Sequence, residues 1–160
     1  MSLVCFDTNF VIWGVKKECT TGQEQNIERA SYIIEQCSKE GKQIVIPTLV
    51  LGELLSGLNA EKHGSFVQSL ERMFILAPYD SRAAVHYARM WQSRTRETGS
   101  PLTRSEIKAD FMIAAIAVAQ KCDCIYTNDG PLTKFAKSFI PVIPTSEIIL
   151  PAKQEQLLDA

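Results

Sequence analysis

The segment Leu3-Val4-Cys5-Phe6-Asp7-Thr8-Asn9 decides how the rest of the chain is interpreted. Its first four residues form a short, continuous apolar run, which is typical of a strand that is buried on both faces. The three polar residues after it predict a loop at the end of that strand. A strand of this kind favours a parallel sheet that is covered by helices on both sides.

Downstream of this segment, helical and strand-like patterns alternate. The segments that predict helices are 26–38, 48–57, about 61–72, 81–97 and 103–120, with one short helix after residue 131. The segments that predict strands are 43–46, 74–76, 124–126 and 140–143. We therefore predict an α/β fold with three layers, α/β/α, around a central, mostly parallel β-sheet.

Several helix ends are marked by single residues. Gly41 predicts the end of the first long helix, and Asp80 is placed to cap the helix that begins at Ser81. Gly99-Ser100-Pro101 predicts the end of that helix, and Thr103-Arg104-Ser105-Glu106 has the capping-box pattern for the next one. Residues 127–131 have the composition of a turn.

Composition limits the class of protein. With 160 residues and 46% hydrophobic content, the chain is long enough for one domain, which we place at 1–150, with a tail at 151–160. A net charge of −1 argues against binding nucleic acid by bulk charge, so any such site has to be local. The longest apolar segment, 111–119, is too short to span a membrane, and the N-terminus lacks the pattern of a signal peptide. We expect a cytoplasmic protein.

Other common kinds of site are disfavoured. The five cysteines form no CxxC pair, so we predict neither a disulfide framework nor a structural zinc site. His63 and His86 lack a recognisable nucleophile partner and are interpreted as structural or surface residues. A Gly-rich phosphate loop, which an NTPase or a dehydrogenase would need, is missing from the sequence.

Four acidic residues are the candidates for chemistry. Asp7 and Asp129 each follow a predicted strand, and ligands of parallel sheets bind beyond the carboxyl ends of the strands. Each could also be an ordinary turn or cap residue. Glu53 lies in an apolar helical stretch, where it is either a site residue or part of a thin polar stripe. Asp110 has apolar neighbours at helical spacing, which predicts a side chain facing the core.

Acids that converge on one edge of a sheet repel one another. A hard divalent cation with oxygen ligands, such as Mg²⁺ or Mn²⁺, relieves that repulsion. A bound cation of this type lowers the pKa of a water molecule and neutralises charge on a phosphodiester. We therefore expect Asp7, Glu53, Asp110 and Asp129 to form a metal site.

At this point the sequence resembles the PIN-domain family, especially the single-domain VapC-like toxins of prokaryotic toxin–antitoxin systems. The resemblance covers nearly the whole chain, and four motifs in order carry it: Asp7-Thr8-Asn9, the segment 46–57 around Glu53, Asp110-Phe111-Met112-Ile113-Ala114-Ala115, and Thr127-Asn128-Asp129. One departure is Gly130-Pro131-Leu132, where many relatives carry a further acid and an aromatic residue.

The resemblance implies a Mg²⁺- or Mn²⁺-dependent endoribonuclease that leaves 5′-phosphate and 3′-hydroxyl ends. The four acids would be both catalytic and metal-binding residues. Thr8, Asn9, Thr127 and Asn128 would orient the acids or water molecules, or they are simply turn and cap residues. The implied partners are an RNA substrate, a cognate antitoxin and a second copy of the chain in a homodimer.

Basic residues gather in the middle of the chain. Lys108 and Arg104, near the start of the helix that holds Asp110, are candidates for contacting a substrate phosphate. Tyr87 and Trp91 lie among these basic residues, and such a surface suits RNA phosphates and unstacked bases. The same composition also fits a solvated helix face whose Trp91 packs in the core or at a dimer contact. Alternatives to a toxin are a housekeeping RNA-processing nuclease, a non-catalytic PIN-like module that binds RNA or protein, and a metal-dependent phosphatase.

Overall fold

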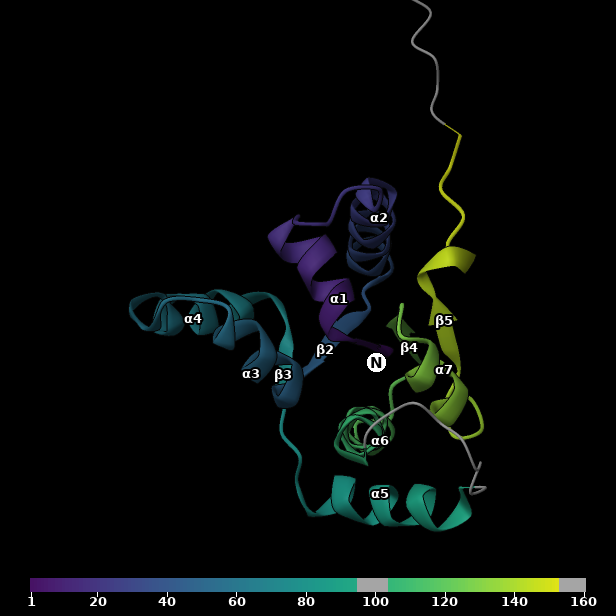
Figure 1. The fold of residues 1–160 in the computed structure, drawn as a ribbon. Coiled ribbons are helices and arrows are strands. Elements are labelled where there is room, and N and C mark those ends of the chain that lie inside the picture. Colours follow the sequence, from purple (N-terminus) through teal and green to yellow (C-terminus); the bar gives the residue numbers. More distant parts are fainter. Residues whose placement is uncertain (95–103, 153–160) are drawn as a thin grey trace, which may run out of the picture.

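A parallel sheet of five strands forms the centre of the molecule (Figure 1). The computed structural model describes residues 1–94 and 104–152, with only the backbone of 104–106. The strand order is β3-β2-β1-β4-β5. The strands are β1 (Leu3–Phe6), β2 (Gln43–Pro47), β3 (Ile75–Ala77), β4 (Cys124–Thr127) and β5 (Val142–Pro144). The predicted fold class is confirmed.

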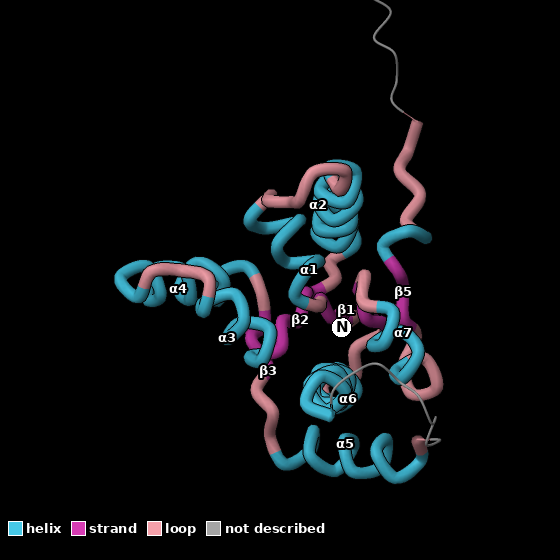
Figure 2. The backbone as a smooth tube through the Cα atoms, in the orientation of Figure 1, coloured by secondary structure: helices cyan, strands magenta, loops and turns pink. Residues whose placement is uncertain are grey.

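Helices cover both faces of this sheet, as the cyan segments of Figure 2 show. The helices are α1 (Thr8–Val11), α2 (Glu24–Glu40), α3 (Thr48–Ser56), α4 (His63–Met73), α5 (Ser81–Ser93), α6 (Arg104–Ala119) and α7 (Gly130–Ala136). In Figure 1, α1 and α2 lie on one side of the sheet, whereas α5 and α6 lie on the other. Within the described residues, the structure contains no helix that is long and apolar enough to cross a membrane.

The central strand β1 pairs with β2 on one side and β4 on the other. Val4 is in register with Ile44 of β2 and with Cys124 of β4. The chain moves from β1 outward through β2 and β3, then crosses back to β4, so the strand order reverses between β1 and β4. In open α/β sheets, ligands bind at such a reversal, outside the carboxyl ends of the strands.

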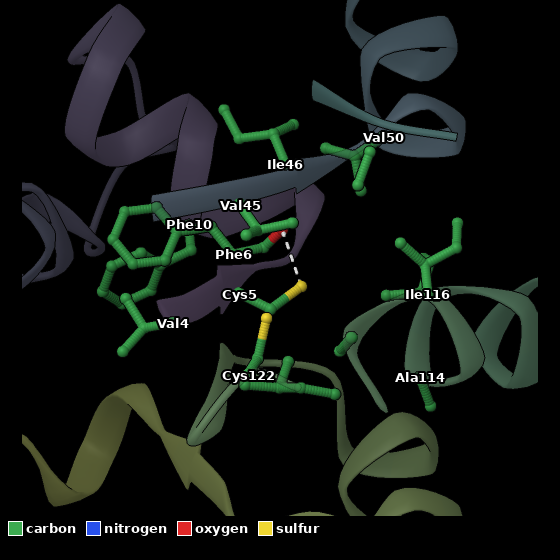
Figure 3. Close-up of a cluster of buried hydrophobic side chains, with 14 of the residues drawn as sticks. Val4, Cys5, Phe6, Phe10, Val45, Ile46, Val50, Ala114, Ile116 and Cys122 are labelled. Carbon is green, nitrogen blue, oxygen red and sulfur yellow. Dashed lines mark hydrogen bonds between the residues drawn. The ribbon is translucent and has the colours of Figure 1, made fainter. Parts of the chain in front are cut away.

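The hydrophobic core joins this sheet to α6 (Figure 3). Phe6 and Ile46 from the strands, Phe10 from α1 and Ile116 from α6 are all fully buried. The side chains of 113–117 in α6 are buried without interruption. This explains why that helix is apolar on nearly every side, since its surroundings are protein rather than water.

Two predicted helix ends are confirmed. Gly41 adopts a left-handed conformation, with φ of 68°, and its N–H donates to carbonyl oxygens in the last turn of α2. Asp80 caps α5, because its Oδ1 accepts a hydrogen bond of 3.0 Å from the N–H of Ala83. The capping box at 103–106 and the helix end at 99–101 lie outside the described residues or side chains.

The segment after β1 differs from the sequence prediction. A loop was expected at Asp7-Thr8-Asn9, but α1 begins at Thr8 and continues as a π-helix over Ile12–Lys16. Phe10 and Val11 are fully buried, so packing against the core stabilises a helix that local propensity does not indicate.

Other boundaries also moved. The helix predicted for 81–97 ends at Ser93, after which Arg94 is extended. The turn predicted for 127–131 is shorter, because α7 already begins at Gly130. Asp110, which was predicted to face the core, is half-buried. Asp110 lies in the second turn of α6, before the continuously buried segment begins.

Truncating a core side chain tests this packing. We expect Ile116→Ala to lower the free energy of unfolding by about 2–5 kcal/mol, because it removes apolar contacts and leaves a cavity. Urea denaturation followed by circular dichroism measures the change. Ile149→Ala is the matched control, because Ile149 is 87% exposed and its truncation should cost less than about 0.5 kcal/mol. Equal losses in the two variants would contradict the packing described here.

Candidate active site

Asp7 occupies the carboxyl end of the central strand. Its backbone N–H donates to the carbonyl oxygen of Tyr126 at 3.1 Å, which extends the pairing of β1 with β4. Its side chain is only 6% exposed, and its Oδ1 accepts a 2.7 Å hydrogen bond from the N–H of Thr8. Asp7 is therefore both the N-cap of α1 and a buried carboxylate.

The hydroxyl group of Thr127 joins Asp7 to Asp129. This buried hydroxyl, at the end of β4, donates to Oδ2 of Asp7 at 2.7 Å. It also accepts a 2.9 Å hydrogen bond from the backbone N–H of Asp129. The N–H can only donate, so the hydroxyl proton is left for the carboxylate of Asp7. Both oxygens of Asp7 are thus fixed by hydrogen bonds from neighbouring residues.

The electrostatics at Asp7 are dominated by its burial, which raises the pKa of the carboxyl group above its ordinary value. The hydrogen bonds from Thr127 and Thr8 act in the opposite direction, because they favour the ionised form. The negative charges of Asp129 and Glu53 raise the pKa further. The structure therefore brings Asp129 and Glu53 close enough to Asp7 to affect its ionisation.

Asp129 is half-buried at the start of α7, which it caps. Its Oδ1 accepts a 2.8 Å hydrogen bond from the N–H of Leu132. This cap uses Oδ1 of Asp129, and Oδ2 takes no part in the capping hydrogen bond. The interpretation of Asp7 and Asp129 as helix caps is thus correct, and it is compatible with a role in a shared site.

Glu53 is on α3, the helix that begins where β2 ends. Although its neighbours in the sequence are apolar, its side chain is exposed, so it belongs to a polar stripe of that helix. The hydroxyl group of Thr8 donates a hydrogen bond to its Oε2. Thr8 therefore holds Asp7 through its backbone and Glu53 through its side chain.

Asp110 lies on α6, a helix that contacts both α3 and β4. Within the described residues, no group of three or more His, Cys, Asp or Glu side chains could hold a metal ion as placed, so no preformed cage is present there. Mg²⁺ does not need such a cage, because it keeps several water molecules and binds directly to one or two carboxylates. A buried, pre-oriented carboxylate beside two further acids fits this kind of cation.

The remaining predicted residues are less closely connected to the acids. Asn9 and Asn128 are exposed, and among the described side chains it is Thr8 and Thr127 whose hydroxyl groups reach the acids. Lys108 is exposed on α6, and the side chain of Arg104 lies outside the described part.

Thr145 is a supporting residue that the sequence analysis missed. It is fully buried after β5, and its hydroxyl donates to the carbonyl oxygen of Thr127 at 3.4 Å. Its position after the last strand matches that of Asp7 after β1, so the rule that placed acids at strand ends could have identified it.

The protein has an α/β/α fold with an acidic site. Asp7 and Asp129 form this site at the carboxyl ends of β1 and β4, the strands between which the strand order reverses. The sequence profile of the PIN domain matches residues 4–138, which include all four acids. The chain belongs to the PIN-domain family, a family of nucleases. The resemblance that the motifs indicated is confirmed.

Solved structures share this fold. The chain is similar to one in VapBC2 from Rickettsia felis bound to a DNA fragment from its promoter, with a TM-score of 0.63, 16% identity, and coverage of 89% of this chain and 98% of that one. It is also similar to one in DNA-bound VapBC from Salmonella typhimurium, with a TM-score of 0.63, 20% identity, and coverage of 91% and 99%. For VapBC-1 from nontypeable Haemophilus influenzae, the TM-score is 0.61 at 17% identity, with coverage of 90% and 98%. No curated protein matches the chain significantly.

Removing the hydroxyl group of Thr127 tests its role. We expect Thr127→Val to destabilise the protein by about 1.5–3 kcal/mol at pH 8, because a buried charged carboxylate loses a donor. The change also raises the pKa of Asp7 further above its ordinary value. A raised pKa in the folded state costs stability as the pH rises through it, so the loss should shrink as the pH falls below that pKa.

Urea unfolding across pH measures this effect, with Thr127→Ser as the matched control that keeps the hydroxyl group. The assignment fails if valine and serine give the same loss, or if the loss with valine does not vary with pH.

Proposed function

We propose that the protein is a metal-dependent endoribonuclease of the VapC-like toxin type. The observation that carries the proposal is the buried carboxylate of Asp7, which is fixed by Thr8 and Thr127 beside Asp129 and Glu53. Orienting a charged group in this way costs stability. That cost is explained if the carboxylate has to be ionised and aligned for a cation.

The acids Asp7, Glu53, Asp110 and Asp129 would hold one or two Mg²⁺ or Mn²⁺ ions, directly or through water. When bound, such a cation lowers the pKa of a water molecule and offsets negative charge on a phosphodiester. The residues of the chain do the positioning. Thr127 favours the ionised form of Asp7 and aligns it, and Thr8 restrains Glu53, so that little reorganisation is needed when the substrate arrives.

Support for the toxin part of the proposal comes from the structural relatives. The similar chains are components of VapBC complexes, two of which are bound to DNA. We propose that this chain likewise associates with a cognate antitoxin that blocks its activity. We also propose that the protein is a cytoplasmic homodimer. Contacts from Lys108 and Arg104 to the substrate stay a prediction.

Loss of Asp7 should abolish cleavage. We expect Asp7→Asn to lower the rate of RNA cleavage in Mn²⁺ by at least about 100-fold, because even residues that only orient metal ligands typically contribute 10- to 100-fold. The rate is measured by gel electrophoresis of cellular RNA. Glu71→Gln, which also neutralises one acid but lies exposed on α4, is the matched control and should cleave normally.

Calorimetric titration with Mn²⁺ accompanies the assay. The wild type should bind the ion and Asp7→Asn should bind it much more weakly. Equal cleavage by wild type and Asp7→Asn would place catalysis elsewhere, and a chain that binds RNA but neither binds metal nor cleaves would be a non-catalytic PIN-like module.

The toxin assignment has its own test in growing bacteria. Induced expression of the wild type should arrest growth, whereas Asp7→Asn should not, because arrest requires cleavage. Where a small open reading frame adjoins the gene, its co-expression should restore growth. Unimpaired growth with the wild type, at expression levels confirmed by immunoblot, would favour a housekeeping nuclease.

A further inference from the structure

A pocket beside the acidic site has an unusual lining. It lies between the end of α5, the middle of α6, and α7 with the residues after it, and its cavity volume is about 480 Å³. That volume falls within the roughly 300–1,000 Å³ of small-ligand sites. Among the described residues that line it are three cations, Arg94, Lys134 and Lys137, and none of those residues is an acid. On a chain with a net charge of −1, a pocket whose described lining holds cations and no acid is a distinct local feature.

The other conspicuous lining residues are aromatic: Phe111, Phe135 and Phe139. The rings of Phe111 and Phe135 are stacked, with centroids 5.5 Å apart and planes inclined by 23°. Phe139 is 39% exposed, whereas Phe135 is half-buried and Phe111 is buried. Exposed aromatic rings next to cations provide a stacking surface for bases and charge for phosphates.

Arg94 is held in place at the rim. Its guanidinium carbon lies 3.5 Å from the centre of the Trp91 ring, and Trp91 is itself packed edge-on against Phe111. Stacking on an aromatic face fixes the plane of a guanidinium group while its N–H donors stay directed outward. A fixed guanidinium group of this kind suits a phosphate, which it can bind through two donors at once.

The pocket shares two helices with the acidic site. Phe111 directly follows Asp110 on α6, and Lys134 follows Asp129 on α7. At about 1.5 Å of rise per residue, Lys134 and Lys137 lie about 7.5 and 12 Å along the helix direction from Asp129. A single-stranded chain that enters the acidic site could therefore continue into the pocket.

We propose that this pocket binds an unpaired nucleotide of the RNA substrate at a short distance from the scissile bond, with its base on Phe139 and Phe135 and its phosphate at Arg94 and Lys137. The inference rests on the proposed ribonuclease function, and it adds a subsite that selects single-stranded RNA. Charge and aromatic rings together favour a nucleotide over a purely anionic or purely apolar ligand.

The test is equilibrium binding of a short, fluorescein-labelled single-stranded oligoribonucleotide, measured by anisotropy in EDTA. All proteins carry Asp7→Asn, so that binding is scored without turnover. We expect Lys137→Ala to reduce the steepness of log affinity against log salt by about 0.7, the value for one phosphate contact on a single strand. We expect Phe139→Ala to weaken affinity roughly 5- to 100-fold without changing that slope, because a lost base stack is not ionic.

Matched controls separate the pocket from general effects. Lys39→Ala removes a cation from α2, on the opposite side of the sheet, and Met73→Ala removes an exposed apolar side chain from α4. Both should leave affinity and slope unchanged. Lys137 and Phe139 are exposed, so the urea midpoints of their variants should match that of the parent chain.

Unchanged RNA binding in both pocket variants would overturn the inference, and so would equal effects from the control variants. A labelled peptide rich in Glu and Phe is titrated in parallel. If the pocket variants lose affinity only for this peptide, the pocket is a protein-docking site and the inference is also overturned. Failure here is distinguishable from failure of the ribonuclease proposal. A chain that cleaves RNA but is insensitive to Lys137→Ala and Phe139→Ala keeps its function and loses this subsite. If the protein binds RNA through the pocket but never cleaves it, the subsite is supported and the ribonuclease proposal fails.

Discussion

The structure of the site depends on the hydrogen bond from Thr127 to Asp7. This bond connects the ends of β1 and β4, the two strands between which the strand order reverses. The same hydroxyl accepts the N–H of Asp129, so one side chain sets the position of two acids. Because Asp7 is buried, an unsatisfied carboxylate there would cost far more than the bond itself contributes. The site is therefore assembled by the same contacts that join the two halves of the sheet.

Much of the fold was predictable because the three inner strands, β1, β2 and β4, are largely buried. Continuous apolar runs such as 3–6 and 124–126 can only be accommodated between helical layers, and the acids after them then fall at one edge. Local capping residues were informative as well, as Asp80 and Gly41 show. The helix after Asp7 was not predictable, since it is stabilised by the burial of Phe10 and Val11 in a core built from distant segments.

For the site, the residue types were predictable and their environments were not. Glu53 and Asp110 both have apolar neighbours in the sequence, yet Glu53 is exposed and Asp110 is half-buried. Asp7, which the sequence places in a loop, is the most buried of the four acids. The orientation of a side chain depends on how its helix packs, and hydrophobic periodicity specifies that only loosely when most of a helix is apolar. The pocket at α7 was missed for a different reason, because Arg94, after α5, is distant in the sequence from Lys134 and Lys137.

The central claim is that the fixed carboxylate of Asp7, with its neighbouring acids, holds a divalent cation. Crystals soaked in Mn²⁺ and measured at the manganese absorption edge test this claim most directly, because the anomalous signal locates the ion independently of activity. We expect an anomalous peak for an ion that is bound by Asp7 and by at least one of Glu53, Asp110 and Asp129. A peak elsewhere, or an acidic site without a peak at saturating Mn²⁺, would contradict it.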